Sequence, residues 1–179
     1  QYRRFNTSNL NNRPEQTKTV EMSKDYYVVT LHNDQKRNLY AYIDDEDLFG
    51  EKVIYLERDD RNAATEADYV MVEFFLDWFP VMTDQDVYIM GAITDWNLDE
   101  KNKMTYDYER KGYALNLLLK QGYYDYIYAV KERGQTTADV GVVAGDFWET
   151  QNEYTIYLYL FDPTQNYDQL IGVKTVLSH

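Results

Sequence analysis

Cysteine is absent from the 179 residues of this chain. Its absence excludes thiol nucleophiles, disulfides and thiolate metal sites. Histidine occurs only twice, as His32 and as the last residue, His179. A Ser-His-Asp triad would have to use His32, and a metal site made of several histidines is nearly excluded. No stretch approaches the roughly 18 apolar residues of a membrane-spanning helix, so we expect no membrane insertion.

Positive charge is also scarce. The chain has 18 Lys and Arg residues against 31 Asp and Glu residues, and its formal net charge is -13. Affinity for phosphate comes largely from clustered Lys and Arg, so this balance argues against a nucleic-acid partner. It equally disfavours electrostatic docking on anionic lipid.

Apolar and aromatic residues, in contrast, are abundant. Hydrophobic residues make up 44% of the chain and aromatic residues 16%, which argues for a folded protein. The 19 tyrosines favour strands. Apolar residues alternate with a period of two between turn residues, and no capped segment has a period of 3.6, so the sequence predicts an all-β protein. The expected strands are 25–32, 39–43, 52–56, 69–76, 86–93, 104–108, 113–119, 124–130, 154–161 and 170–176.

Two of these strands are separated by only a few residues. Residues 113–119 and 124–130 each place large apolar side chains on one face, and Lys120, Gln121 and Gly122 lie between them. A glycine supplies the positive φ that tight turns need. The sequence therefore predicts a hairpin closed at Gly122.

The composition changes near residue 66. Residues 1–66 carry a net charge of -3, and residues 67–179 carry -10 and seven of the eight glycines. The polar stretch 58–66 is typical of a connection. We therefore predict a small β unit at 1–66, the truncated end of a preceding domain, and a β-sandwich at 67–179. The start at Gln1 has neither an initiator Met nor an apolar signal, so we read the chain as a piece of a longer protein.

One run within 67–179 is distinctive. It is DVYIMGAITDW at residues 86–96, followed by LKQGYYDY at 119–126. Both segments resemble the early-set, immunoglobulin-like sandwiches that include the glycogen- and starch-binding modules. In such a fold Gly91 would let the strand bend where Trp96 folds back. The resemblance implies an immunoglobulin-like sandwich.

A second resemblance spans nearly the whole chain. The segments that carry it are YRRF (2–5), ADYV (67–70), GAITDW (91–96), LKQGYY (119–124), ETQNEY (149–154) and YDQLIG (167–172). In this order they resemble the C-terminal half of the type IX secretion system plug protein family. The resemblance implies a non-enzymatic periplasmic protein that caps the periplasmic side of an outer-membrane secretion pore, with the pore protein as its partner. It implies no catalytic residues and no cofactor.

Trp96 has two interpretations. In the starch-binding relatives the corresponding Trp stacks on sugar, together with a Lys on the next strand and a second Trp beyond it. Here Ile127 takes the place of that Lys, and residues 131–134 contain no Trp. A lone Trp96 therefore favours a loop anchor that packs on the sandwich.

Four further aromatic residues are candidates for contact with a partner. They are Trp78, Phe79, Phe147 and Trp148, and all four are expected near turns. Aromatic residues in loops usually cover a core, but binding surfaces are enriched in them. For a protein that caps a pore, we consider them candidate contact residues.

Acidic residues suggest two further sites. Residues 44–47 read Asp-Asp-Glu-Asp and could hold Ca²⁺, but the spacing of an EF-hand loop is missing, so a solvated acidic turn is favoured. This segment also departs from the shorter acidic turn expected in the plug family. With 31 carboxylates, a pair at glycosidase-like separation will arise by chance. We therefore predict neither a metal site nor a catalytic site, and no small-molecule ligand.

Three functions remain open at this point. The first is the pore-capping protein. The second is a carbohydrate-binding module for α-glucans, which the early-set resemblance would allow. The third is an accessory domain of an enzyme.

Overall fold

The computed structural model describes residues 2–11, 13–14, 16–37, 48–57, 67–145 and 153–177. The chain divides into two compact units, Gln1–Asp146 and Phe147–His179. Each unit is described by itself.

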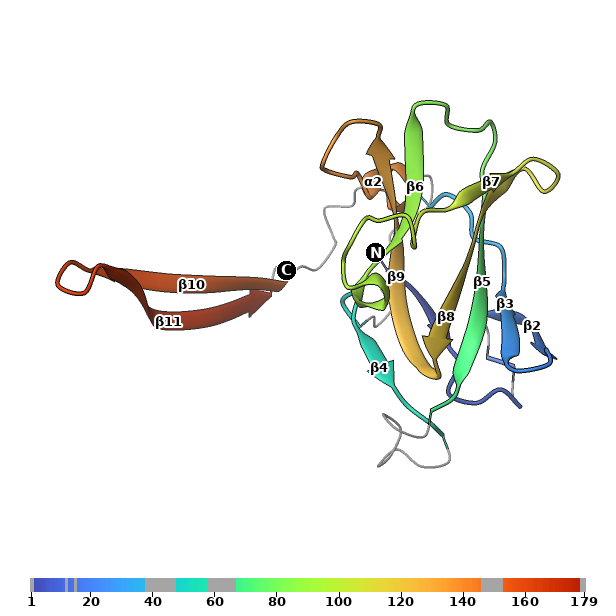
Figure 1. The fold of residues 1–179 in the computed structure, drawn as a ribbon, viewed down its shortest axis with the longest axis horizontal. Coiled ribbons are helices and arrows are strands. Elements are labelled where there is room, and N and C mark those ends of the chain that lie inside the picture. The colour runs from blue at the N-terminus through green and yellow to red at the C-terminus, as the bar shows by residue number, and fades with distance from the viewer. Residues whose placement is uncertain are drawn as a thin grey trace. The chain divides into compact units, whose positions relative to one another are not determined.

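The first unit contains two sheets (Figure 1). The five-stranded sheet has the order β2 (Thr17–Met22), β3 (Tyr27–Leu31), β5 (Tyr69–Asp77), β8 (Gly112–Lys120) and β7 (Thr105–Asp107). Strands β3 and β5 are parallel, and the other neighbours are antiparallel.

The second sheet is built around β9. This long strand pairs with β1, β4 and β6, always antiparallel. The bounds are β1 (Arg3–Asn6), β4 (Lys52–Ile54), β6 (Gln85–Met90) and β9 (Gly122–Glu132). A short 3-10 helix, η1 (Ala92–Thr94), follows β6, and one helical turn, α2 (Gly141–Ala144), follows β9.

The core lies between these two sheets. Val72 and Phe74 of β5 belong to the same buried cluster as Ile89 of β6 and Tyr128 of β9. Phe5 of β1 joins the cluster through its ring, which stacks on Tyr124 at 5.1 Å. The predicted all-β sandwich is therefore confirmed.

Most of the predicted strands are present with shifted ends. Strands β3 to β9, and β10 and β11 of the second unit, all overlap the predicted segments. The segment predicted at 39–43 lies outside the described residues. Two strands were not predicted, β1 and β2, because their sequences RRFN and TKTVEM show little apolar alternation.

The hairpin predicted at Gly122 is wrong. Strand β8 pairs with β5 and β7, and β9 pairs with strands of the other sheet, so the short link at Gln121 crosses from one sheet to the other. Gly122 has no positive φ. A Cβ at this position would instead meet the backbone oxygen of Val53 at 2.3 Å, so the glycine is needed for the close approach of β4.

The connection between the sheets is held by hydrogen bonds. The Gln121 backbone N–H donates to the Asp68 oxygen at 2.9 Å, and its side-chain amide donates to the Thr7 oxygen at 3.2 Å. The Thr7 hydroxyl oxygen accepts from the Gly122 N–H at 3.1 Å. The segments 2–8, 67–70 and 119–124 therefore meet at this connection.

The domain boundary predicted near residue 66 is also wrong. Strands β1 and β4 pair with β9, and β3 pairs with β5, so residues 1–66 supply strands to both sheets of the sandwich. The division falls at residue 146 instead. The change in composition at 66 marks a connection within one unit, because strand pairing between distant segments leaves no trace in local charge.

The second unit contains a single antiparallel hairpin. Its strands are β10 (Glu153–Asp162) and β11 (Tyr167–Leu177). The register shifts by one residue between Leu158 and Tyr159, which places a bulge in β11. No helix in the described residues has the length and apolar character needed to cross a membrane.

Candidate functional site

Trp96 lies just after the end of β6. The chain turns there at Gly91, whose φ of +146° favours glycine, and the Trp96 N–H donates back to the Gly91 oxygen at 2.9 Å. The indole meets the Tyr2 ring edge-on at 6.2 Å. A Cβ on Gly50 would come within 2.4 Å of the indole, so this glycine makes room for it. Trp96 is packed on two segments of the sandwich and keeps 43% of its surface exposed.

The other parts of a starch-type sugar site are not assembled around Trp96. Ile127, which takes the place of the lysine, is buried in β9 with 5% exposure. It lies opposite Met90 of β6, so it cannot reach a ligand at the surface. The geometry supports a loop anchor better than one half of a sugar clamp.

Trp78 and Phe79 follow the end of β5, and they differ in exposure. Trp78 is half-buried and packs against the core, and the Lys36 ammonium lies 5.1 Å from the centre of its ring. Phe79 is 74% exposed, with the Lys111 ammonium 5.7 Å from its ring centre. Phe79 is therefore the better contact candidate of the two.

The structure does not bring Trp96 together with Trp78 and Phe79. The two aromatic residues precede β6 and Trp96 follows it. Six extended residues separate the ends of this strand by about 20 Å. The other two candidates, Phe147 and Trp148, lie outside the described residues.

A tyrosine-lined groove, which the sequence reasoning missed, lies near Phe79. The ring of Tyr106 is edge-on to both Tyr108 and Tyr113, at 5.0 Å from each centre. Tyr113 is buried, and its hydroxyl oxygen accepts from the Met82 N–H at 3.0 Å. Burial raises the pKa of Tyr113. Tyr108 is 77% exposed, so the three rings lead from the core to the surface.

The groove has a volume of about 430 Å³ and a charged rim. The Lys103 ammonium lies 3.0 Å from the Asp86 carboxylate, and the Arg133 guanidinium lies 3.8 Å from it. The hydrogen bond with Asp86 raises the pKa of Lys103. Lys103 therefore keeps its positive charge near neutral pH, beside the wall of tyrosine rings.

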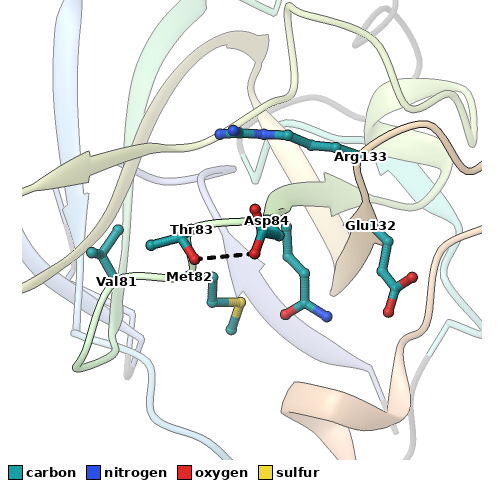
Figure 2. A pocket seen from close by; sticks show the side chains of 7 residues that line it. Val81, Met82, Thr83, Asp84, Glu132 and Arg133 are labelled. Carbon is teal, nitrogen blue, oxygen red and sulfur yellow. Dashed lines mark hydrogen bonds between the residues drawn. The ribbon is translucent and has the colours of Figure 1, made fainter.

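A second hollow of about 620 Å³ adjoins the groove and shares Arg133 with it. It is lined by Val81, Met82, Thr83, Asp84, Gln85, Glu132 and Arg133. In Figure 2 the Arg133 side chain extends over the segment that carries Thr83 and Asp84, and Glu132 points to the other side. The Arg133 N–H donates to the Asp84 oxygen at 3.0 Å, which ties the end of β9 to this segment.

The loop after β5, strand β7 and the start of β8 bring these aromatic residues to one end of the sandwich. The Trp78 N–H donates to the Lys111 oxygen at 3.4 Å, so the loop after β5 touches the turn between β7 and β8. We call this surface the aromatic end. Its residues are Trp78, Phe79, Tyr106, Tyr108 and Tyr113.

A buried polar cluster lies in the interior of the same unit. The Asp34 carboxylate accepts from the Tyr126 and Tyr128 hydroxyls at 2.6 and 2.7 Å. The Arg3 guanidinium lies 3.0 Å from the same carboxylate and 5.1 Å from the Tyr128 ring centre. Burial raises the pKa of both tyrosines well above the usual value for tyrosine, and the negative charge of Asp34 adds to the effect.

Such a cluster can mark a catalytic site, but its partners here point to a structural role. Asp34 continues the parallel pairing of β3 with β5, and its N–H donates to the Phe75 oxygen at 2.8 Å. Its carboxylate reaches Tyr126 and Tyr128 on the opposite sheet and Arg3 on β1. The cluster therefore joins the two sheets.

Within the described part of the chain, no three or more His, Asp or Glu side chains are grouped so that they could hold a metal ion. The acidic segment 44–47 lies outside that part. His32 is exposed at the end of β3, where its N–H donates to the Gln16 oxygen at 3.0 Å.

Comparison with solved structures finds a similar protein. A hypothetical protein from Parabacteroides merdae has the same fold, with a TM-score of 0.91 and 37% identity over 99% of this chain. This chain spans 44% of the length of that protein's chain. No family model matches the sequence, and no curated protein matches it.

Proposed function

We propose that this chain is the C-terminal part of a type IX secretion plug protein. In this role it caps the periplasmic side of the outer-membrane pore and catalyses no reaction. The proposal starts from the six sequence segments that resemble that family.

The observation that supports it most is the way these segments contact one another. Phe5 of segment 2–5 stacks on Tyr124 of segment 119–124 at 5.1 Å. Tyr2 meets Trp96 of segment 91–96 edge-on at 6.2 Å. The Gln121 N–H donates to the Asp68 oxygen, which adds segment 67–70. Four of the segments therefore form one framework, as expected if they specify a common fold.

Outside this framework, the aromatic end has the composition of a contact surface. Aromatic residues, Met and Arg are enriched in the cores of protein interfaces. At the aromatic end, three tyrosines line the groove together with Met82 and Arg133. The exposed Phe79 precedes the lining residue Val81 by two positions. We propose that this end meets the periplasmic rim of the pore.

Affinity purification of the tagged pore protein tests the proposal. The complete plug candidate should co-purify at low salt, because screening weakens contacts made by a chain with a net charge of -13. Phe79→Asp and Tyr108→Asp should each reduce the recovered amount at least about tenfold, because each buries a charge in the interface. Met22→Asp is the matched control, since Met22 is 73% exposed on β2.

Two outcomes would contradict the proposal in different ways. If the wild-type protein never co-purifies while known pore subunits do, the secretion function should be dropped. If it co-purifies and Met22→Asp is as damaging as Phe79→Asp, only the aromatic end is wrong.

The alternative is a carbohydrate-binding module for α-glucans. Its supporting feature is the partly exposed indole of Trp96, and its weakness is the buried Ile127. We expect no measurable binding of maltoheptaose in isothermal titration. A dissociation constant tighter than roughly 1 mM would restore this alternative.

A further inference from the structure

The hairpin of β10 and β11 is apolar on both faces. Residues that lie directly opposite in an antiparallel pair share a face. One face carries Tyr154, Ile156, Leu158, Leu160 and Val176. The other carries Tyr157, Tyr159, Phe161, Leu170 and Val173.

All of these side chains are exposed in the hairpin, at between 41% and 58% of their surface. The strands offer little charge to solvate them, since the charged residues between 153 and 177 are Glu153, Asp162, Asp168 and Lys174. Exposed strand edges in soluble proteins are normally protected by charges, prolines or short length. Neither β10 nor β11 is short, and neither contains a proline.

This pattern is typical of strands that are covered on both sides. Strands with two buried faces have nearly continuous apolar runs, and β10 reads YTIYLYLF between its two acidic ends. A two-stranded hairpin alone is marginally stable in water. The sequence of the hairpin therefore fits a layer inside a larger β domain.

The length of the similar protein indicates where such a domain is found. The match with the Parabacteroides protein covers 99% of this chain, and so includes the hairpin, yet it takes up 44% of that protein's chain. More than half of that polypeptide therefore remains to cover the hairpin.

A second copy of the chain fits the hairpin less well. A two-fold contact uses the same patch on both partners. Face-to-face packing of two hairpins would cover one face of each and leave the other exposed. Edge-to-edge pairing would cover neither face.

We propose that β10 and β11 are two strands of a second β-sheet domain, whose other strands lie in further chain of the same polypeptide. Backbone hydrogen bonds at the open strand edges and apolar contacts on the two faces join them to that domain. This inference does not depend on the secretion function.

Hydrogen exchange on the complete polypeptide, compared with residues 1–179 alone, tests the proposal without any substitution. Amides of 153–177 that do not face the partner strand of the hairpin should exchange at least about a hundredfold more slowly in the complete polypeptide, because new partners protect them. Equal exchange in the two proteins would overturn the proposal.

A pair of variants in the complete polypeptide gives a second test. Leu158→Asp should lower the melting temperature of the transition that includes the hairpin, since it places a charge in a covered face. Met22→Asp, at a comparably exposed position on the first unit, should leave that transition unchanged. Size-exclusion chromatography of the complete polypeptide tests the other interpretation. If it elutes as a dimer and Leu158→Asp converts it to a monomer, a second copy covers the hairpin and the proposal is wrong.

Discussion

Strands β9 and β10 have similar tyrosine-rich sequences but opposite surroundings. The β9 tyrosines at every second position are Tyr124, Tyr126 and Tyr128, and the β10 tyrosines are Tyr154, Tyr157 and Tyr159. The first three are at most 3% exposed, and the last three are 56–57% exposed. The difference teaches that tyrosine-rich alternation specifies an extended strand, while burial depends on which other segments cover it.

The hydroxyl groups explain why the β9 tyrosines can be buried. Tyr126 and Tyr128 donate to Asp34, and Tyr124 donates to the Lys120 oxygen. A buried hydroxyl without such a partner would cost free energy. Asp34 follows β3, far from β9 in the sequence. The first unit can therefore provide a hydrogen-bond acceptor from a distant segment, which an isolated hairpin cannot do.

The largest expected effect comes from truncating matched phenylalanines in the two units. Phe74→Ala should lower the free energy of unfolding by about 3–5 kcal/mol, because the side chain is 1% exposed and leaves a cavity. Phe161→Ala in β10 should leave the unfolding of the first unit unchanged. Urea denaturation of the 179-residue chain measures both.

An effect of Phe161→Ala as large as that of Phe74→Ala would contradict the comparison. It would mean that the hairpin contributes to the same cooperative core as the sandwich.

The buried ion pair should give the next largest effect. Arg3→Met should lower the free energy of unfolding by about 3 kcal/mol, because it leaves the Asp34 carboxylate without its cation. Lys52→Met removes the exposed pair with Asp95 and should cost at most about 0.5 kcal/mol. Thermal and urea unfolding measure both variants. If Arg3→Met and Lys52→Met lower the stability equally, the interior cluster contributes no more than a surface ion pair.

Gly122 in the first unit and Gly172 in the hairpin differ in the space available for a side chain. Gly122→Ala should cost about 1–3 kcal/mol, because its Cβ would meet a backbone oxygen that cannot move aside. Gly172→Ala in β11 should be neutral or slightly stabilising, since the Cβ would lie 3.8 Å from the Leu158 Cβ, an ordinary contact. A neutral Gly122→Ala, measured by urea denaturation, would refute the packing reason for this glycine.

High pH should also lower the stability of the first unit. Burial raises the pKa of Tyr126 and Tyr128 above 10, so the folded state holds these protons more tightly than the unfolded state. Their contribution is fully present below pH 10 and is lost as the pH rises through the folded pKa values. The loss should be on the order of 1 kcal/mol per tyrosine for each pH unit above 10.

Urea denaturation at pH 8, 10 and 11 measures this dependence. The Tyr126→Phe and Tyr128→Phe double variant should show a flatter decline, whatever its absolute stability. If phenolate absorbance shows that all 19 tyrosines ionise while the protein stays folded, the raised pKa of Tyr126 and Tyr128 is contradicted.

The sequence predicted part of the candidate site. Trp78 and Phe79 were identified as contact candidates from their bulk and their place beside turns, and Phe79 is indeed exposed. The tyrosine groove was missed, because Tyr106 and Tyr113 come together only when β7 pairs with β8 and the loop after β5 closes over them. The Asp34 cluster was missed for the same reason, since Arg3 and Tyr126 are distant in sequence.

By itself, the sequence determined the all-β class and the position of most strands, because the pleat of a strand forces side chains to alternate whatever its neighbours are. Tertiary structure decided which sheet each strand joins. Strands β8 and β9 belong to different sheets although only Gln121 separates them. Strands β1, β3 and β4 belong to the same unit as β9. Those choices depend on backbone hydrogen bonds and apolar cover between distant segments. Local sequence does not encode those choices, since tyrosine-rich strands of similar composition are buried in β9 and exposed in β10.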